Sequence, residues 1–174
     1  MSYYRPPTPM PTIYAVTVSF VICAIAAALE GACAGKNVKS FFERLQSPAY
    51  APPLWVWYII GIVYYATFVF VLYRILSLNS DSILKLVTLS LIVFMMTANA
   101  LWNYVFFRAR KLFLAFVTGS AAPVFDALLF VCLLRLDSLA AWTLIPYLLY
   151  RVYAVWWGCA LWKLNRTLES SPCR

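Results

Sequence analysis

Residues 83–107, ILKLVTLSLIVFMMTANALWNYVFF, form a long apolar run in which Lys85 is the only charged side chain. About 20 consecutive apolar residues are enough for an α-helix to cross the roughly 30 Å hydrocarbon core of a bilayer. Backbone N–H and C=O groups inside that core must be satisfied within the segment itself, which favours a helix. The stretch therefore predicts a transmembrane helix.

Four further runs of similar length lie on either side of this stretch. We predict an all-α integral membrane protein, a bundle of five transmembrane helices with a long loop between the first two. A β-barrel would need short segments of alternating hydrophobicity, which the sequence lacks. The single transmembrane domain covers 13–164, between a polar arm (1–12) and a short tail (165–174). The predicted spans are 13–34, 54–76, 83–107, 112–134 and 139–164.

The composition agrees with this fold and excludes several functions. Hydrophobic residues make up 64% of the chain, charged residues only 11%, and the mean hydropathy is +0.81. No histidine is present, which excludes Ser-His and Cys-His triads and the usual histidine metal sites. The five cysteines contain no CxxC pair, so we expect packing thiols rather than a disulfide framework or a metal cluster. We expect no required cofactor.

The net charge of +8 fits basic loops that face the headgroups of a lipid bilayer, so we expect no nucleic-acid partner. The N-terminal arm and the second and fourth loops lie on one side of the membrane and carry four basic residues, namely Arg5, Arg74, Lys85 and Arg135. The first loop, the third loop and the C-terminal end lie on the other side and carry nine, namely Lys36, Lys39, Arg44, Arg108, Arg110, Lys111, Lys163, Arg166 and Arg174. Arg151 lies inside a span and is not counted. This asymmetry predicts that loop 1, loop 3 and the C-terminus are cytoplasmic.

Aromatic residues, 18% of the chain, recur at helical spacing along three of the predicted spans. These stripes fit either plain bundle core or a pocket for a flat apolar ligand, in which rings stack on the ligand and a few polar groups orient it. Gly61 and Ala154 would leave room for such a ligand. The candidate ligand-binding residues are Trp57, Tyr58, Gly61, Asn99, Trp102, Phe106, Tyr150, Ala154 and Trp157.

Intramembrane charges form a second candidate. Asp126 and Arg151 lie in consecutive antiparallel spans, and at 1.5 Å per residue their depths differ by only about 4 to 5 Å. Unpaired charges are costly in hydrocarbon, so we predict that the two side chains form an ion pair or share a polar pocket, either for structure or to grip an anionic ligand group. We expect Glu30 to reach headgroups or Lys36. Pro123 is expected to kink its helix, as is Pro146 near the start of the fifth span.

Small residues spaced by four suggest close helix contacts. Ala27, Gly31 and Gly35 follow this spacing in the first span, and Ala115 and Gly119 follow it in the fourth. Packing within one bundle and dimerisation are both compatible with the pattern.

Three segments, in order, resemble the tryptophan-rich sensory protein/translocator protein family (TspO/MBR, the peripheral benzodiazepine receptor family). Residues 47–56, SPAYAPPLWV, resemble its KPxWxPPxWV lead into the second helix. Residues 99–110, NALWNYVFFRAR, resemble its NxxWxxxFFxxR element. PYL at 146–148, followed by LWKLN at 161–165, resembles the fifth helix.

The resemblance implies a five-helix bundle, often dimeric, with a cavity under loop 1 for tetrapyrroles, sterol-like lipids or drug-like aromatics. By motif, Trp102 matches a pocket tryptophan, Tyr150 stands where the family often has tryptophan, and Ala154 matches a small residue of the pocket wall. Departures include Gly61 in place of a tryptophan and the loss of a tyrosine at Cys159. The altered motif at Cys159 argues against sterol binding there.

These observations predict a membrane receptor or sensor for a planar hydrophobic ligand, with a porphyrin or other tetrapyrrole first among the candidates. Two alternatives stay open. One is a transporter of tetrapyrroles or sterol-like lipids. The other is a light-dependent porphyrin-degrading enzyme, which rests on the resemblance alone because no constellation in the sequence supplies a base, nucleophile or metal site.

Overall fold

The computed structural model of the chain describes residues 11–79 and 82–166, so most of the predicted arm and tail lie outside the described residues. The described residues form helices and no strands. Five helical spans are long and apolar enough to cross a membrane, which confirms the predicted fold class. The elements are α1 (Thr12–Ala34), α2 (Val38–Arg44), α3 (Leu54–Ser77), α4 (Ile83–Asn103), the π-helix η1 (Tyr104–Arg108), α5 (Leu112–Leu136), α6 (Ser138–Thr143) and α7 (Ile145–Leu164).

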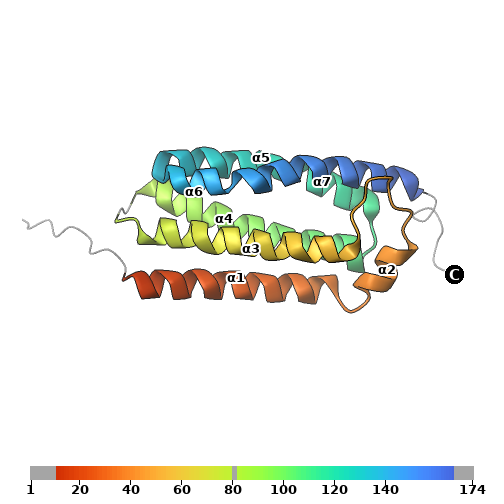
Figure 1. Ribbon diagram of the computed structural model, residues 1–174, viewed down its shortest axis with the longest axis horizontal. Helices are drawn as coiled ribbons and strands as arrows, with labels where there is room; N and C mark the ends of the chain where they lie inside the picture. The colour runs from red at the N-terminus through yellow and green to blue at the C-terminus, as the bar shows by residue number, and fades with distance from the viewer. Residues whose placement is uncertain (1–10, 80–81, 167–174) are drawn as a thin grey trace, which may run out of the picture.

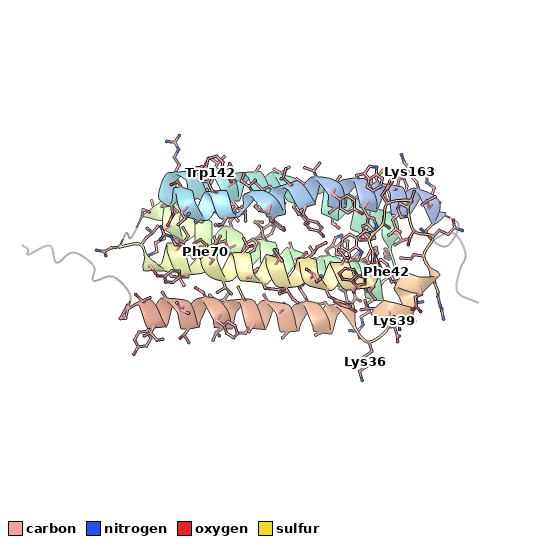
Figure 2. All side chains as sticks on the ribbon, viewed as in Figure 1. Lys36, Lys39, Phe42, Phe70, Trp142 and Lys163 are labelled. Atoms are coloured by element: carbon pink, nitrogen blue, oxygen red, sulfur yellow. The ribbon has the colours of Figure 1, made fainter. Side chains whose placement is uncertain are left out.

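The long helices lie side by side in an elongated bundle (Figure 1). Helix α1 packs against α3 and α4, α4 packs against α5, and α5 packs against α7. Helix α2 and the chain that leads from it to α3 cover the end of the bundle at which α7 also finishes (Figure 1). Lys36, Lys39 and Lys163 gather at this same end (Figure 2). We call it the α2 end.

Packing differs between the two ends of the bundle. Away from α2, a mainly aliphatic core centres on fully buried side chains such as Phe68, Leu72 and Leu133. At the α2 end, a smaller cluster is built around Phe41, Phe106 and Trp157. Ligand pockets in proteins are lined predominantly by hydrophobic and aromatic side chains. The aromatic end is therefore where cavities are expected.

The fifth span is broken into two helices, α6 and α7. The break falls at Leu144, and Pro146 occupies the first turn of α7, where its missing N–H costs no helical hydrogen bond. The predicted disruption at Pro146 is thus a full interruption. Pro123 has a milder effect, since α5 is assigned as one continuous helix through it.

An ion pair fastens the end opposite α2. Arg74 Nε of α3 donates to Asp137 Oδ2 at 2.6 Å, and Asp137 also caps α6 by accepting from the Ala140 N–H at 3.1 Å. Burial alone raises the pKa of Asp137, but the hydrogen bonds from Arg74 and Ala140, together with the charge of Arg74, outweigh burial. The net pKa of Asp137 lies below its ordinary value.

Asn165 fastens the α2 end. Its side-chain oxygen accepts from the Gln46 N–H at 2.9 Å, and its amide nitrogen donates to the carbonyl oxygens of Gln46 at 3.0 Å and Leu161 at 2.8 Å. The side chain is only 1% exposed. A single asparagine therefore ties loop 1 to the last turn of α7.

Candidate functional site

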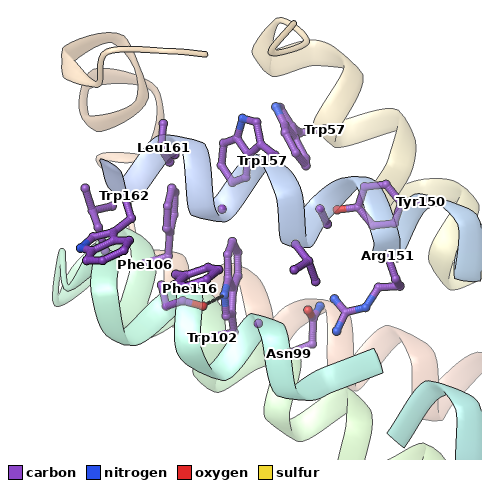
Figure 3. A pocket seen from close by; sticks show the side chains of 16 residues that line it. Trp57, Asn99, Trp102, Phe106, Phe116, Tyr150, Arg151, Trp157, Leu161 and Trp162 are labelled. Atoms are coloured by element: carbon purple, nitrogen blue, oxygen red, sulfur yellow. Dashed lines mark hydrogen bonds between the residues drawn. The ribbon is translucent and has the colours of Figure 1, made fainter. Parts of the chain in front are cut away.

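Aromatic rings fill the space between α3 and α7 at the α2 end. The ring centroids of Trp57 on α3 and Trp157 on α7 are 4.5 Å apart, and Tyr150 meets Trp57 edge-on at 6.3 Å. From the α4 side, Trp102 stacks on Phe106 at 4.9 Å, with an interplanar angle of 8°. Figure 3 shows these rings converging from three sides.

Two small cavities lie among these rings, of about 160 Å³ and about 70 Å³. We call the pair, with the rings that line it, the aromatic cavity. Eight of the nine candidate ligand-binding residues line one or both parts. They are Trp57, Gly61, Asn99, Trp102, Phe106, Tyr150, Ala154 and Trp157.

Tyr58 is the candidate that the structure does not bring to the aromatic cavity. Its side chain is 58% exposed on the outer surface of α3, and it lines neither part. Successive side chains on an α-helix point about 100° apart, so Trp57 and Tyr58 cannot face the same space. The sequence pattern grouped them because α3 is apolar on all sides.

Polar groups line one end of the aromatic cavity. Asn99 Nδ2 donates to Glu30 Oε1 at 2.6 Å, which joins α4 to α1. The expectation that Glu30 reaches headgroups or Lys36 is therefore wrong. In hydrocarbon a carboxylate needs a hydrogen-bonding partner, and Asn99 supplies one inside the bundle.

The predicted pair of intramembrane charges is formed. Arg151 Nε donates to Asp126 Oδ2 at 2.8 Å, and both side chains are largely buried. The Arg151 guanidinium lies 5.7 Å from the Tyr147 ring centroid and lines both parts of the aromatic cavity. Its charge thus borders the space where a ligand would lie.

Loop 1 covers the aromatic cavity with a pair of phenylalanines from α2. Phe42 stacks on Trp157 at 6.4 Å with an interplanar angle of 13°, and Phe41 meets Phe106 edge-on at 5.7 Å. The Tyr153 hydroxyl donates to the Tyr50 carbonyl at 3.0 Å, a second tie between α7 and the loop. We did not single out Phe41 and Phe42 from the sequence, although two adjacent aromatic residues between the charged Lys39 and Glu43 were a usable signal.

A family model described as the TspO/MBR family matches residues 19–163, a range that contains the whole aromatic cavity. The chain belongs to the TspO/MBR family. This confirms the resemblance inferred from the three motifs. No curated protein matches the sequence.

In this TspO/MBR protein, Trp102 separates the aromatic cavity from a second hollow. Its Nε1–H donates to the Ala115 carbonyl at 2.9 Å, so the indole bridges α4 and α5. A Cβ on Gly119 would stand 3.2 Å from that nitrogen. The small residues of α5 therefore serve packing within the bundle, whereas Ala27 and Gly31 of α1 are exposed.

The second hollow is a groove of about 480 Å³ between α4 and α5. Asn99, Trp102 and Arg151 line both this groove and the aromatic cavity. Several of its other wall residues, including Phe94 and Leu101, are exposed on the outer surface of the TspO/MBR protein. In a bilayer this surface would face lipid, so the groove leads from the lipid phase toward Trp102.

Proposed function

We propose that this protein is a membrane receptor for a planar hydrophobic ligand, most simply a porphyrin or related tetrapyrrole, bound in the aromatic cavity under loop 1. One observation carries the proposal. Rings from α2, α3, α7 and the α4–η1 segment converge on one space that has few polar groups. Aromatic walls with a small number of oriented polar groups are typical of sites for flat apolar ligands.

The aromatic cavity must enlarge when such a ligand enters. Its two parts are smaller than the roughly 300–1,000 Å³ of typical ligand pockets. Phe42 stacks on Trp157 from a short helix in a loop, so it can be displaced without opening the bundle. The ligand then replaces ring-to-ring contacts within the protein with ring-to-ligand contacts of similar kind.

A titration with protoporphyrin IX tests the proposal. Detergent-purified protein is titrated while tryptophan fluorescence and porphyrin absorbance are followed. We expect saturable binding with one porphyrin per chain. Absence of saturable binding would overturn the tetrapyrrole assignment, and a lipid screen would then be the next step.

Two variants locate the bound porphyrin. Trp102→Ala and Phe42→Ala each remove a ring of the aromatic cavity, and each should weaken binding about fivefold or more, since an aromatic contact contributes on the order of 1 kcal/mol beyond area burial. Trp142→Ala is the matched control, because Trp142 is 63% exposed at the opposite end of the bundle (Figure 2). Equal losses in all three variants would indicate non-specific adsorption.

Transport of the same ligand is a second candidate, favoured by the groove between α4 and α5. A hydrophobic molecule could pass from the lipid phase to the aromatic cavity if Trp102 swung aside. Flux of protoporphyrin IX across proteoliposomes tests this, with protein-free liposomes as the baseline. Flux equal to that baseline, together with retained binding, would contradict transport and support the receptor function.

A homodimer belongs to the same proposal. Ala27 and Gly31 present a small-residue surface on α1 that no other part of the described chain covers. Small residues spaced by four let two helices approach closely in lipid. Native mass spectrometry of the detergent-released protein should show the dimer, and Gly31→Leu should reduce its share.

A further inference from the structure

Two tryptophans of the aromatic cavity carry buried ring nitrogens with no acceptor. Trp57 Nε1 and Trp157 Nε1 are both shielded from solvent and make no hydrogen bond within the described part of the chain. Trp157 as a whole is only 4% exposed. Buried indole N–H groups normally find a partner, because leaving a donor unsatisfied in an apolar interior is costly.

The two unsatisfied donors lie close together. Their ring centroids are 4.5 Å apart, both rings line both parts of the aromatic cavity, and Figure 3 shows the two ring nitrogens turned to the same side. Trp102 is different, since its N–H is already committed to the Ala115 carbonyl at 2.9 Å. Of the four tryptophans that line the aromatic cavity, namely Trp57, Trp102, Trp157 and Trp162, only Trp57 and Trp157 have buried ring nitrogens without an acceptor among the described residues.

The position of the free donors suits a polar group on the ligand. Trp57 lies in the first turn of α3, and Trp157 lies about two turns before the end of α7. Both are thus near the α2 end of the bundle, with Gly61 and Tyr64 deeper along α3. A ligand can place its apolar body toward Gly61 and keep its polar group nearer the aqueous surface.

We propose that the paired indole N–H groups of Trp57 and Trp157 recognise an oxygen acceptor, a carbonyl or carboxylate, on the planar ligand. The inference rests on the proposed function and adds that the ligand must carry an oxygen acceptor. Stacking alone accepts any flat apolar ring system, whereas the donor pair selects ring systems that carry such an oxygen. Trp57 and Trp157 are therefore specificity-determining residues as well as walls of the cavity.

Three porphyrins that share one ring system test this. Protoporphyrin IX carries carboxylates, its dimethyl ester carries ester carbonyls, and octaethylporphyrin carries no oxygen. We expect the wild-type protein to bind both oxygen-bearing porphyrins about tenfold more tightly than octaethylporphyrin, the scale of one or two net hydrogen bonds. Trp157→Phe and Trp57→Phe keep a ring but remove the donor, and should bring this ratio close to one.

Trp102→Phe is the matched control. It removes an indole from the same cavity, but one whose N–H is bound within the protein, so it should weaken all three porphyrins alike and preserve the ratio. Equal binding of the three porphyrins by wild type would overturn the donor-pair inference and leave the proposed function standing. If none of the three binds, both fail.

A second measurement does not depend on the variants folding. In ¹⁵N-labelled wild-type protein, two indole N–H resonances should move further downfield with protoporphyrin IX dimethyl ester than with octaethylporphyrin, since both porphyrins impose similar ring-current shifts. Identical spectra in the two complexes would contradict the inference.

Discussion

Gly119 shows how one residue sets the wall of the aromatic cavity. The Trp102 indole reaches the Ala115 carbonyl only by passing close over Gly119, where an added Cβ would lie 3.2 Å from the ring nitrogen. Such a contact is tighter than packed side chains normally allow. The absence of a side chain at this position is therefore part of what holds Trp102 across α4 and α5.

We expect Gly119→Ala to displace Trp102 and to destabilise the protein by about 1–2 kcal/mol, the usual cost of modest overpacking. Thermal unfolding in detergent and the emission maximum of tryptophan fluorescence measure the two effects. Gly61→Ala is the control for stability, because a Cβ there meets nothing within 4 Å. A stable Gly119→Ala protein with unshifted fluorescence would contradict the role given to Gly119.

The Asp126–Arg151 pair leads to a second prediction at this scale. Arg151→Met leaves the Asp126 carboxylate buried without its partner and should cost about 3–5 kcal/mol. The double variant Asp126→Leu with Arg151→Met removes both charges and should recover most of that loss. Thermal unfolding of the single and double variants measures the difference. A double variant as unstable as the single one would contradict the claim that the loss comes from an unpaired buried carboxylate.

At the scale of elements, the two ends of the bundle are closed by different polar devices. Asn165 ties loop 1 to α7 with three hydrogen bonds at the α2 end. The Arg74–Asp137 pair ties α3 to the start of α6 at the other end. Each pair of elements also packs through buried apolar side chains, such as Phe41 and Leu45 at the α2 end and Ala140 at the other end, and the polar groups add directional ties to that packing.

Asn165→Ala should release loop 1 from the bundle. The substitution removes the side chain that accepts from the Gln46 N–H and donates to the Gln46 carbonyl, and Asn165 is only 1% exposed, so water does not readily replace it. We expect faster amide hydrogen exchange in residues 45–53 and faster dissociation of protoporphyrin IX. Ser40→Ala is the control, since its hydroxyl bonds only within the same loop at 3.1 Å. Unchanged exchange in Asn165→Ala would mean that aromatic packing alone holds the loop.

Asp137 should make stability depend on pH. Its pKa is lower in the folded protein than in the unfolded chain, so its contribution is present above about pH 4 and is lost as pH falls through the folded pKa. Asp137→Asn should lower the unfolding temperature at pH 6 and reduce the further loss between pH 5 and pH 3. Glu43→Gln is the control, because the exposed Lys39–Glu43 pair, at 4.0 Å, should contribute little. Parallel curves for wild type and Asp137→Asn would contradict this prediction.

At the scale of the whole molecule, the basic residues predict how the bundle sits in a membrane. Lysines of loop 1 and of the end of α7 gather at the α2 end (Figure 2). The positive-inside rule predicts that this end is cytoplasmic. The aromatic cavity would then open toward the cytoplasmic leaflet.

Reporter fusions check this orientation. A fluorescent protein fused to the C-terminus should fold and fluoresce, and a phosphatase that is active only outside the cytoplasm should be inactive at the same position. The opposite pattern would invert the assignment. Lys36→Gln combined with Lys39→Gln should weaken the bias measurably, because the rule depends on the number of basic residues close to the spans.

The sequence by itself determined the number and extent of the transmembrane helices. The thickness of the hydrocarbon core sets the length of an apolar run, and that length can be read from the sequence without knowledge of any tertiary contact. It also predicted that Asp126 and Arg151 lie at one depth, because the rise per residue of a helix is fixed. Trp102, Tyr150 and Ala154, which the family resemblance singled out, all line the aromatic cavity.

Only the tertiary structure decided which way each helix is turned and where loop 1 lies. In a membrane helix that is apolar on every side, sequence periodicity gives no clear inner face, so Tyr58 looked as suitable as Trp57 and Glu30 was assigned to the surface. Rotation is set instead by contacts with neighbouring helices, such as the Asn99–Glu30 hydrogen bond. Phe42 stacks on Trp157, and Asn165 holds the same loop through Gln46. Gln46 and Asn165 are 119 positions apart, so no local sequence pattern encodes their contact.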